Sequence, residues 1–582
     1  MITAKPAGKK EKRWFNRWLP IALLRLVQFR RNLRRNNLHD TSTLSNPILI
    51  SPPRQPDNKD IRWRTADGSF NDLQHPEMGM AGTRFGRNIP LCDARRDEER
   101  LLKPNPRVIS SSLLARETFK PANILSLLAA AWIQFETHDW FSHGDNQPDR
   151  QIEVPGQQDE ELLKIDRTLA DHTRSDQQND PPSFINYETH WWDASQIYGS
   201  NSERVNLLRS NTDGKLRIGD DGRLPLDESK GIDLVGNPGT WWLGLSLLHT
   251  LFVKEHNLIC DHLKRDNPTW SDDQLYNHAR LIVAAITAKI HTVEWTPAIL
   301  PNEITKTALH ANWWGILGPN IKKIIGRVAD SELLSGIVGS SEVKHDGAPY
   351  YLTEEFTSVY RMHPLIPDHY TFYSFETGNA IKEAEFNDIF DQKTRPFMSQ
   401  LSFEDMLYSF GVSYPGALSL HNYPKFLREL RKPNGELLDL ASVDILRDRE
   451  RGIPRYNRFR ELIGLGRVDK FSDITSNQQW AREIAQAYDN DIDQVDLMVG
   501  LYAEDLPPGF GFSETAFHIF ILMASRRLRS DRFYTKDYTP ETYTKWGLQW
   551  IEETTMKKLI LRHYPRLSGV LSDVENVFAP WK

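Results

Sequence analysis

Helical spacing of apolar residues is the pattern that most limits how this chain can fold. Apolar side chains recur every three or four residues in four long segments, which is the spacing of a buried or amphipathic helix. The segments are residues 121–140, 240–264, 271–295 and 513–533. Ser271 and Ser513 open two of them with a capping residue followed by acids. Because alternation typical of strands is scarce, we predict a mainly α fold with few short strands.

The composition is that of an ordinary globular protein, with 39% hydrophobic and 26% charged residues and a net charge of −6. No repeat or long Gly/Ser linker divides residues 61–582, which we interpret as one catalytic domain behind an arm at residues 1–60. Cys92 and Cys260 are too few for a disulfide framework and fit a reducing compartment, so we expect a cytoplasmic location. A pI of about 6.3 argues against a nucleic-acid partner.

Basic and apolar side chains interleave in residues 14–36, whereas the first 36 residues contain a single acid, Glu11. Pro20 and Arg25 interrupt an apolar run that is already shorter than the roughly 20 residues needed to span a bilayer. We therefore predict contact with an anionic membrane surface. A solvated basic tail and an organelle transit peptide are the alternatives. Residues 37–110 are rich in Pro, Asn, Asp and Arg and are predicted to be irregular.

Two places put reactive side chains on one side of a helix. Gln134 and His138 lie four residues apart and share a helix face, whereas Asp139 is rotated by about 100° from His138. Tyr360 and His363 lie three residues apart, so a helix would project both from one turn. A core tyrosine and a core or surface histidine are the plainer interpretations of these residues taken alone.

A third motif offers oxygen ligands at alternate positions. Thr189, Trp191, Asp193 and Ser195 occupy every second residue of one short segment. Hydroxyls, carboxylates and backbone carbonyls are the donors that Ca²⁺ binds, and Asp139 can complete the set from its helix. A polar turn with side-chain caps explains the local pattern equally well.

Several motifs occur in the chain order of the peroxidase–cyclooxygenase superfamily of haem proteins. They are "QFETHDW", "THWWDASQIYGS", "LHTLFVKEHN", "RDRERGIPRYN" and the segment bearing Tyr360 and His363. More narrowly, "RTADGSFND", "AKIHTVEWT", "ANWWGILG", "LTEEFTSVYRMHPLIPD", "SETAFHIFILMASRRL" and "YTKWGLQW" resemble the fatty acid α-dioxygenases of plants. The likeness runs from about residue 60 almost to the C-terminus and implies a haem peroxidase/cyclooxygenase-like catalytic domain.

The resemblance assigns roles to residues that match the family's motifs. His138 is similar to the distal haem histidine, His363 to the proximal iron ligand and Gln134 to the glutamine of the distal face. Tyr360 resembles the tyrosine that becomes the catalytic radical. Asn422 is the expected partner of the proximal histidine. The positions that match the substrate carboxylate site are His291, Thr296 and Arg527, with Arg526 as the alternative to Arg527. The calcium ligands implied are Asp139, Thr189, Trp191 through its carbonyl, Asp193 and Ser195.

The chain also departs from its wider superfamily. Trp241 and Trp242 stand where halide-oxidising peroxidases carry residues that open peroxide and bind haem covalently. We therefore expect non-covalent haem b and weak peroxidase activity towards small donors, with calcium as the second cofactor that the resemblance implies.

The expected activity is that of a monomeric haem-dependent fatty acid α-dioxygenase. In it a radical on Tyr360 removes hydrogen from C2 and O₂ adds to give a 2(R)-hydroperoxy fatty acid. The alternatives are a haem peroxidase, a dioxygenase acting at another carbon, and a haem-binding protein without catalysis.

Overall fold

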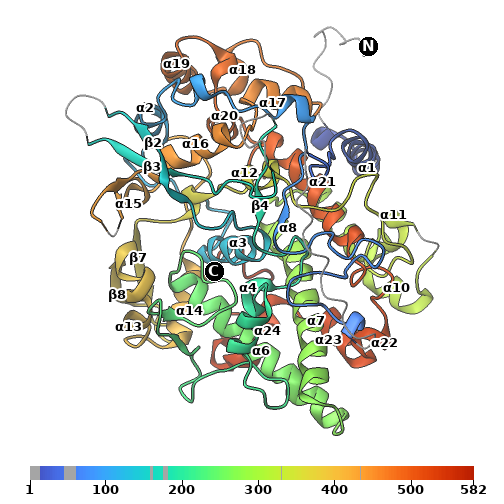
Figure 1. Cartoon of the computed structure of the whole chain (residues 1–582). Helices are drawn as coiled ribbons and strands as arrows, with labels where there is room; N and C mark the ends of the chain where they lie inside the picture. Colours follow the sequence, from blue (N-terminus) through green and yellow to red (C-terminus); the bar gives the residue numbers. More distant parts are fainter. Residues whose placement is uncertain are drawn as a thin grey trace.

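The structure is a computed structural model that describes residues 14–44, 60–156, 161–174, 181–328, 331–432 and 434–581. Helices dominate these residues, and the strands are short (Figure 1). The predicted fold class is therefore confirmed. Residues 1–13 and 45–59 of the expected arm lie outside the described residues.

The described strands form antiparallel pairs and no larger sheet. The pairs are β1 (Thr83–Arg84) with β4 (Ile185–Asn186), β2 (Gln147–Val154) with β3 (Leu163–Arg167), β5 (Leu226–Asp227) with β6 (Ile232–Asp233), β7 (His369–Tyr373) with β8 (Ala380–Glu385), and β9 (Leu430–Arg431) with β10 (Leu437–Leu438). Two strands cannot enclose a core by themselves, so the interior is built by helices.

The four predicted helices are all present. They are α3 (Leu127–Trp140), α6 (Leu243–Asp266), α7 (Asp272–Ile290) and α21 (Glu514–Ser530). Ser271 forms a capping box with Gln274, and Ser513 accepts a bond from the backbone of Ala516. The helix α3 begins later than predicted because Ser126 is extended and bonded to the backbone of Val577 and Phe578.

A π-helical turn, His291–Trp295, extends α7 and leads into α8 (Thr296–Ile299). In this turn the backbone N–H of Thr296 donates to the carbonyl of His291, five residues earlier. Such turns widen a helix by one residue and often mark functional sites. Its effect here is to bring His291 and Thr296 to the same side of the chain, which α-helical spacing would not do.

The central helix of the molecule is α3, which lies in the middle of Figure 1 and packs against α6. In turn α6 packs on α7, while α12 (Glu354–Val359) packs on α21. Almost every residue of α3 is buried, and Trp132, Phe135 and Trp140 are each fully enclosed. A helix that is apolar on all sides belongs in the core. Side chains on different faces of α3 can therefore reach different buried sites.

The remaining described helices surround this core. They are α2 (Pro106–Ile109), α4 (Ser195–Tyr198), α5 (Ser202–Leu208), α9 (Glu303–Trp314), α10 (Gly318–Ile325), α11 (Glu332–Ser335), α13 (Thr394–Met398), α14 (Phe403–Val412), α15 (Lys425–Arg428), α16 (Leu440–Glu450), α17 (Tyr456–Leu462), α18 (Phe471–Ile474), α19 (Gln478–Ala487), α20 (Leu497–Ala503), α22 (Pro540–Tyr543), α23 (Lys545–Glu553) and α24 (Met556–His563).

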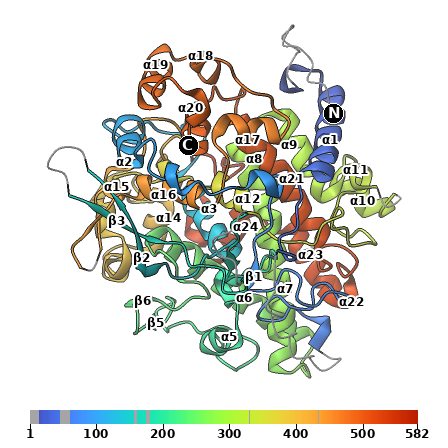
Figure 2. The same ribbon diagram turned by 45° about the horizontal axis from the view of Figure 1, so that its top comes forward.

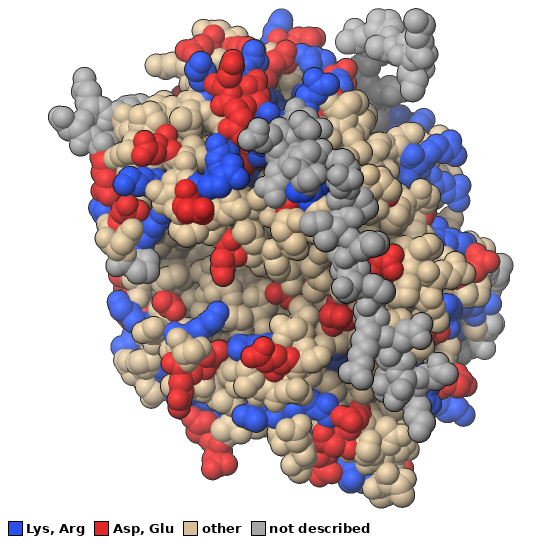
Figure 3. Space-filling model, in the orientation of Figure 1, with Lys and Arg blue, Asp and Glu red and all other residues tan. Residues whose placement is uncertain are grey.

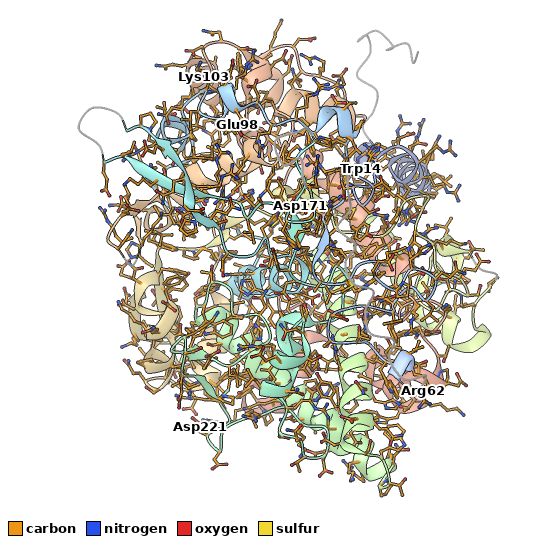
Figure 4. All side chains as sticks on the ribbon, in the orientation of Figure 1. Trp14, Arg62, Glu98, Lys103, Asp171 and Asp221 are labelled. Carbon is orange, nitrogen blue, oxygen red and sulfur yellow. The ribbon has the colours of Figure 1, made fainter. Side chains whose placement is uncertain are left out.

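Residues 19–36 of the predicted arm form a helix, α1 (Leu19–Asn36), that is docked on the rest of the protein. It packs against α9 and α21, and Figures 1 and 2 both show it at the edge of the molecule. Trp14, labelled in Figure 4 beside α1, stacks on Phe517 with ring centroids 5.4 Å apart. Arg30 and Arg34 form ion pairs with Glu332 at 2.7 and 2.9 Å. Of the described helices, none is both long enough and apolar enough to cross a membrane.

Candidate active site

One cavity brings several of the predicted residues together. Its volume is about 480 Å³, and Gln134, His138, Tyr360 and His363 all line it. Apolar side chains from several segments form most of the remaining wall, among them Ile133, Phe141, Met362, Leu365, Phe386 and Leu427. A mainly apolar pocket with a few convergent polar groups is typical of a cofactor or ligand site.

Tyr360 and His363 do not share a turn of α-helix, so that prediction was wrong. The helix α12 ends at Val359, Tyr360 is its capping residue, and His363 begins a short 3₁₀ turn. Pro364 explains the break, because it has no N–H to donate to the carbonyl of Tyr360 and its ring would clash with that carbonyl in a continuous α-helix. Both side chains still line the cavity, held by a helix end and a turn.

Asp444 orients the ring of His363. Its Oδ2 lies 2.7 Å from Nδ1 of the imidazole, and the hydroxyl of Tyr423 lies 3.1 Å from the same nitrogen. Tyr423 also donates to Asp444 at 2.8 Å. Burial alone would raise the pKa of Asp444, but His363 and Arg361 lower it to about 2. An ionised carboxylate at Nδ1 leaves Nε2 as the nitrogen available for a ligand.

Asn422 does not take this role, which corrects the prediction. Its side-chain amide donates to the carbonyls of Lys120 and Ala417, and its oxygen accepts from Arg116 and from the backbone of Lys120. All four bonds tie loops together and none reaches His363. Asn422 is therefore a structural residue beside the site.

Gln134 and His138 line the cavity from one face of α3, as their spacing predicts. The Gln134 oxygen accepts from the indole of Trp242 at 2.7 Å, and its amide donates to the carbonyl of Thr240. Burial lowers the pKa of His138 to about 4, so this imidazole is neutral at pH 7. Gly239 makes room for it, because a Cβ there would come within 2.6 Å of the ring.

The two arginines of α21 have different environments. Arg526 donates to the carbonyls of His345, Ala348 and Pro349, which anchors a loop. Arg527 is also fully buried, yet its Nε and Nη2 have no hydrogen-bond partner in the described structure. A buried guanidinium with unmatched donors is costly unless an anion binds there. Arg527 is therefore the arginine suited to hold a carboxylate.

The indole rings of Trp140 and Trp192 enclose Arg527. The carbon of its guanidinium lies 4.3 Å from each ring centroid, within the range of cation–π interactions. The ring of His291 lies 5.2 Å from Trp140 and 5.3 Å from Trp192. The Tyr360 ring lies 5.0 Å from Trp140. These contacts place the candidate anchor residues next to Tyr360.

His291 and Thr296 join this group through the π turn. The hydroxyl of Thr296 donates to the carbonyl of His291 at 2.8 Å, and the indole of Trp132 donates to the His291 ring at 3.2 Å. Burial, and then the charge of Arg527, lower the pKa of His291 well below its ordinary value. His291 is thus a neutral ring that can share a hydrogen bond with a bound anion.

Four of the five predicted calcium ligands form two hydrogen-bonded pairs, and the fifth, Trp191, was predicted to act through its carbonyl. Ser195 donates from its hydroxyl to Asp139 at 3.0 Å, and Thr189 donates to Asp193 at 2.9 Å. Burial raises the pKa of Asp139, and the nearby Asp193 raises it further. The Asp139 Oδ2 has no hydrogen-bond partner among the described residues, and Arg527 lies 4.0 Å from it. Two close carboxylates with an unmatched oxygen fit a divalent cation.

No group of three histidine, cysteine or acidic side chains suited to a metal occurs in the part of the chain that the structure describes. A cation at Asp139 and Asp193 would therefore rely on two carboxylates together with hydroxyl and carbonyl oxygens. This donor set is the one that Ca²⁺ prefers.

Comparison with known proteins agrees with this geometry. The animal haem peroxidase family matches residues 63–575. The α-dioxygenase PIOX of Oryza sativa is 39% identical, over 99% of this chain and 94% of the relative. The chain belongs to the α-dioxygenases of the animal haem peroxidase family. A crystal structure of the fatty acid α-dioxygenase of Arabidopsis thaliana superimposes on this α-dioxygenase with a TM-score of 0.91, at 36% identity, covering 98% of this chain and 90% of the other.

A second crystal structure carries a ligand. It is that of rice fatty acid α-dioxygenase with one tyrosine replaced by phenylalanine, with palmitic acid. It matches with a TM-score of 0.89 at 37% identity, covering 98% of this chain and 94% of the other.

Haem binding follows from the family, and the residues of this α-dioxygenase fit the group. The cavity volume lies within the roughly 300–1,000 Å³ typical of cofactor sites. His363, with its Nδ1 held by Asp444, is the candidate iron ligand. His138 lines the same cavity from α3, so its ring can face a bound group. The walls between them are apolar, as a porphyrin requires.

The sequence motifs missed Asp444, Tyr423 and the two tryptophans around Arg527. The sequence held one signal for Asp444: it lies four residues before Asp448, on the same face of α16. In the structure both carboxylates contact Arg361. Paired acids on a buried helix need cationic or imidazole partners. For Trp140 and Trp192 no local pattern distinguishes a cation-binding ring from an ordinary core residue.

Replacing Asp444 tests its assignment as the partner of His363. We expect Asp444→Asn to weaken haem binding roughly 10-fold, because contacts of this kind typically contribute 10–100-fold to ligand affinity. Haem titration followed by absorption measures the change. Asn422→Ala is the matched comparison and should bind haem nearly as well as the unaltered protein. Equal losses in the two variants would restore the role first predicted for Asn422.

Proposed function

We propose that this fatty acid α-dioxygenase oxygenates its substrate at C2, with Arg527 as the carboxylate anchor and Tyr360 as the hydrogen-abstracting residue. The observation that carries the assignment is the unmatched, buried guanidinium of Arg527 beside the ring system that contacts Tyr360. A fatty acid offers many similar CH₂ groups, so only its head group can select one of them. A carboxylate held next to a tyrosine presents C2, the adjacent carbon.

Arg527 would bind the two carboxylate oxygens with its planar fork of N–H groups. The neutral ring of His291 can donate a hydrogen bond to the carboxylate, and the hydroxyl of Thr296 can do so by turning its single O–H away from the carbonyl of His291. The tryptophans exclude water from the ion pair, which strengthens its electrostatic attraction. Anchoring at this end leaves the acyl chain to extend along apolar walls.

Tyr360 is a phenol before reaction, because burial raises its pKa well above the ordinary value. A haem held by His363 and faced by His138 would supply one-electron oxidising power, and Tyr360 lines the same cavity as the group that would give up an electron and a proton. The phenoxyl radical takes hydrogen from C2, and O₂ adds to the carbon radical. The resulting peroxyl radical regains hydrogen from Tyr360, giving the 2-hydroperoxy acid, for which we propose the R configuration.

Oxygen uptake with a saturated fatty acid of 12 to 16 carbons tests this function. Saturated acids have no allylic hydrogens, so uptake requires selection by the head group. We expect uptake with formation of a 2-hydroperoxy acid, or the aldehyde one carbon shorter, and its loss in Tyr360→Phe.

Tyr276→Phe is the matched control, since Tyr276 is buried but does not line the cavity. It should keep full activity. Uptake that persists in Tyr360→Phe, or a product oxygenated at another carbon, would contradict the proposal. Mass spectrometry of the product distinguishes the two outcomes.

We further propose that calcium binds at Asp139, Thr189, Asp193, Ser195 and the carbonyl of Trp191. The support is the pair of buried carboxylates with an unmatched oxygen described above. Arg280 pairs with Asp193 at 3.1 Å, whereas Arg527 approaches Asp139 only to 4.0 Å and makes no hydrogen bond with it. A divalent cation would satisfy both acids.

Removing calcium should lower the melting temperature. A ligand present at 100 times its Kd stabilises a fold by about 2.7 kcal/mol, and a chelator abolishes this term. We expect EGTA to lower the Tm of the unaltered protein and to leave that of Asp193→Asn unchanged. Asp496→Asn removes a buried acid paired with Arg449 and should remain sensitive to EGTA. A Tm indifferent to EGTA in every variant, with no calcium in elemental analysis, would rule out the site.

Membrane contact through residues 14–36 is also a proposal, and the structure narrows it. Ala22, Leu26 and Leu33 are buried against the domain, whereas Trp18, Ile21 and Leu24 are exposed. Basic residues on the same helix remain exposed at Arg25, Arg31 and Arg35. In Figure 3 Lys and Arg side chains gather at the upper right, where Figure 1 shows α1. Exposed apolar and basic side chains on one helix fit an anionic bilayer surface.

Vesicle sedimentation tests this contact. Vesicles containing phosphatidylserine should bind the protein more than neutral vesicles, and added salt should weaken binding because screening shortens electrostatic range. We expect Ile21→Ser with Leu24→Ser to reduce binding several-fold. Leu226→Ser with Ile381→Ser, which alters similarly exposed apolar residues elsewhere, is the control. Equal binding by both double variants would contradict a role for α1.

A further inference from the structure

Glu136 is a buried carboxyl group that no assigned role uses. It lies on α3 between Gln134 and His138 but on a different face, and its side chain is fully enclosed. Its Oε2 accepts a hydrogen bond from the indole of Trp192 at 2.8 Å. Its Oε1 has no hydrogen-bond partner among the described residues.

Glu355 and Glu255 show the environment in which a buried glutamate is normally stabilised. Glu355 pairs with Arg87 at 2.8 Å, and Glu255 contacts both Arg562 and His563. Each of these acids is matched by a cation or imidazole, as a buried structural acid normally is. In the described structure the carboxyl group of Glu136 accepts a hydrogen bond from the indole of Trp192 and forms no ion pair. An acid kept in the core without an ion-pair partner costs stability, so a purely structural role explains it poorly.

The hydrogen bond to Trp192 leads directly to the carboxylate anchor. The ring of Trp192 lies 4.3 Å from the guanidinium carbon of Arg527 and 5.3 Å from the ring of His291. Because two nitrogens of Arg527 have no acceptor, the enclosing rings do much to fix its position. A rotation of the Trp192 ring would therefore displace the guanidinium and release one side of His291.

We propose that Glu136 is a positioning residue for the fatty acid carboxylate: by holding the indole N–H of Trp192, it fixes the ring that orients Arg527 and His291. The proposal rests on the proposed function, because it assumes that Arg527 binds the substrate. Burial and the nearby Asp139 raise the pKa of Glu136 well above its ordinary value, against weaker effects of Trp192, Arg527 and Trp140. A neutral acid leaves the charge of Arg527 available for the substrate.

Three substitutions distinguish the effect of the hydrogen bond to Trp192 from the effect of the carboxyl group's charge. Glu136→Gln keeps an oxygen that can accept from Trp192, whereas Glu136→Leu has similar size and no acceptor. Trp192→Phe keeps a ring over Arg527 but removes the indole N–H. If Glu136 acts through Trp192, Glu136→Leu should have no additional effect on binding in the Trp192→Phe protein.

The experiment measures palmitic acid binding by calorimetry in haem-loaded Tyr360→Phe protein, in which the proposed reaction cannot proceed. Added Glu136→Leu should raise Kd about tenfold, the scale of one missing hydrogen bond plus a weakened cation–π contact. Added Glu136→Gln should stay within about threefold of the parent Kd on the same grounds. Hexadecanol, which lacks the carboxylate, should bind all three proteins alike. Absorption of the haem and thermal unfolding check that each variant is folded.

The outcomes distinguish this inference from the proposed function. If palmitic acid fails to bind the Tyr360→Phe parent, the anchor itself is wrong and the role of Glu136 falls with it. If the parent binds but Glu136→Leu binds equally well, only the positioning role is overturned. Equal weakening by Gln and Leu, or additive effects of Glu136→Leu and Trp192→Phe, would also overturn it.

Steady-state kinetics of the protein that retains Tyr360 provide a second measurement. A positioning defect should raise KM for palmitic acid in Glu136→Leu and leave kcat within about twofold, since the hydrogen bond from Trp192 supports ground-state binding. Restoration of KM in Glu136→Gln supports the hydrogen bond. A fall in kcat with unchanged KM would overturn the positioning role.

Discussion

A guanidinium kept out of water is the constraint on which the centre of this protein depends. Arg527 is almost wholly enclosed, and two of its nitrogens lack acceptors. An isolated buried cation is unfavourable, so its surroundings must either supply an anion or receive one. Asp139 lies 4.0 Å away, at the limit of an ion pair, and two indole rings fill most of the remaining space. This incomplete neutralisation is the reason for proposing that Arg527 receives the carboxylate of the substrate.

The helix α3 links the parts of the site because it is buried on every side. One face carries Gln134 and His138 to the cavity, and another carries Glu136 towards Trp192. The residue after His138, Asp139, meets Ser195 at the candidate cation site. A core helix can serve three environments only if each is shielded from the others by packing. The close-packed aromatic side chains around it provide that separation.

Much of the fold was predictable because the long helices are encoded by local periodicity and by capping residues such as Ser271. The roles that require spatial neighbours were less accessible. A three-residue spacing indicated a shared turn for Tyr360 and His363, but the helix ends at Val359 and His363 begins a separate turn before Pro364. Asn422 and Asp444 are far from His363 in sequence, so spacing gave no means of choosing between them. The π turn that unites His291 with Thr296 has no clear sequence signal. Arg526 and Arg527 are adjacent, and only packing distinguishes the loop anchor from the enclosed cation.

The docking of α1 has a consequence for how the protein would approach lipid. Arg30 and Arg34 are held by Glu332, and the helix's inner apolar residues already face the domain. The helix therefore cannot roll its whole apolar stripe into a bilayer without breaking these ion pairs. Any attachment would therefore be shallow, because only the exposed side of the docked helix α1 can enter the bilayer surface. It would not require the helix to leave the domain or to refold. The rate of such an attachment would fall as ionic strength rises. Detachment would leave the cavity lined by Tyr360 and His363 unchanged.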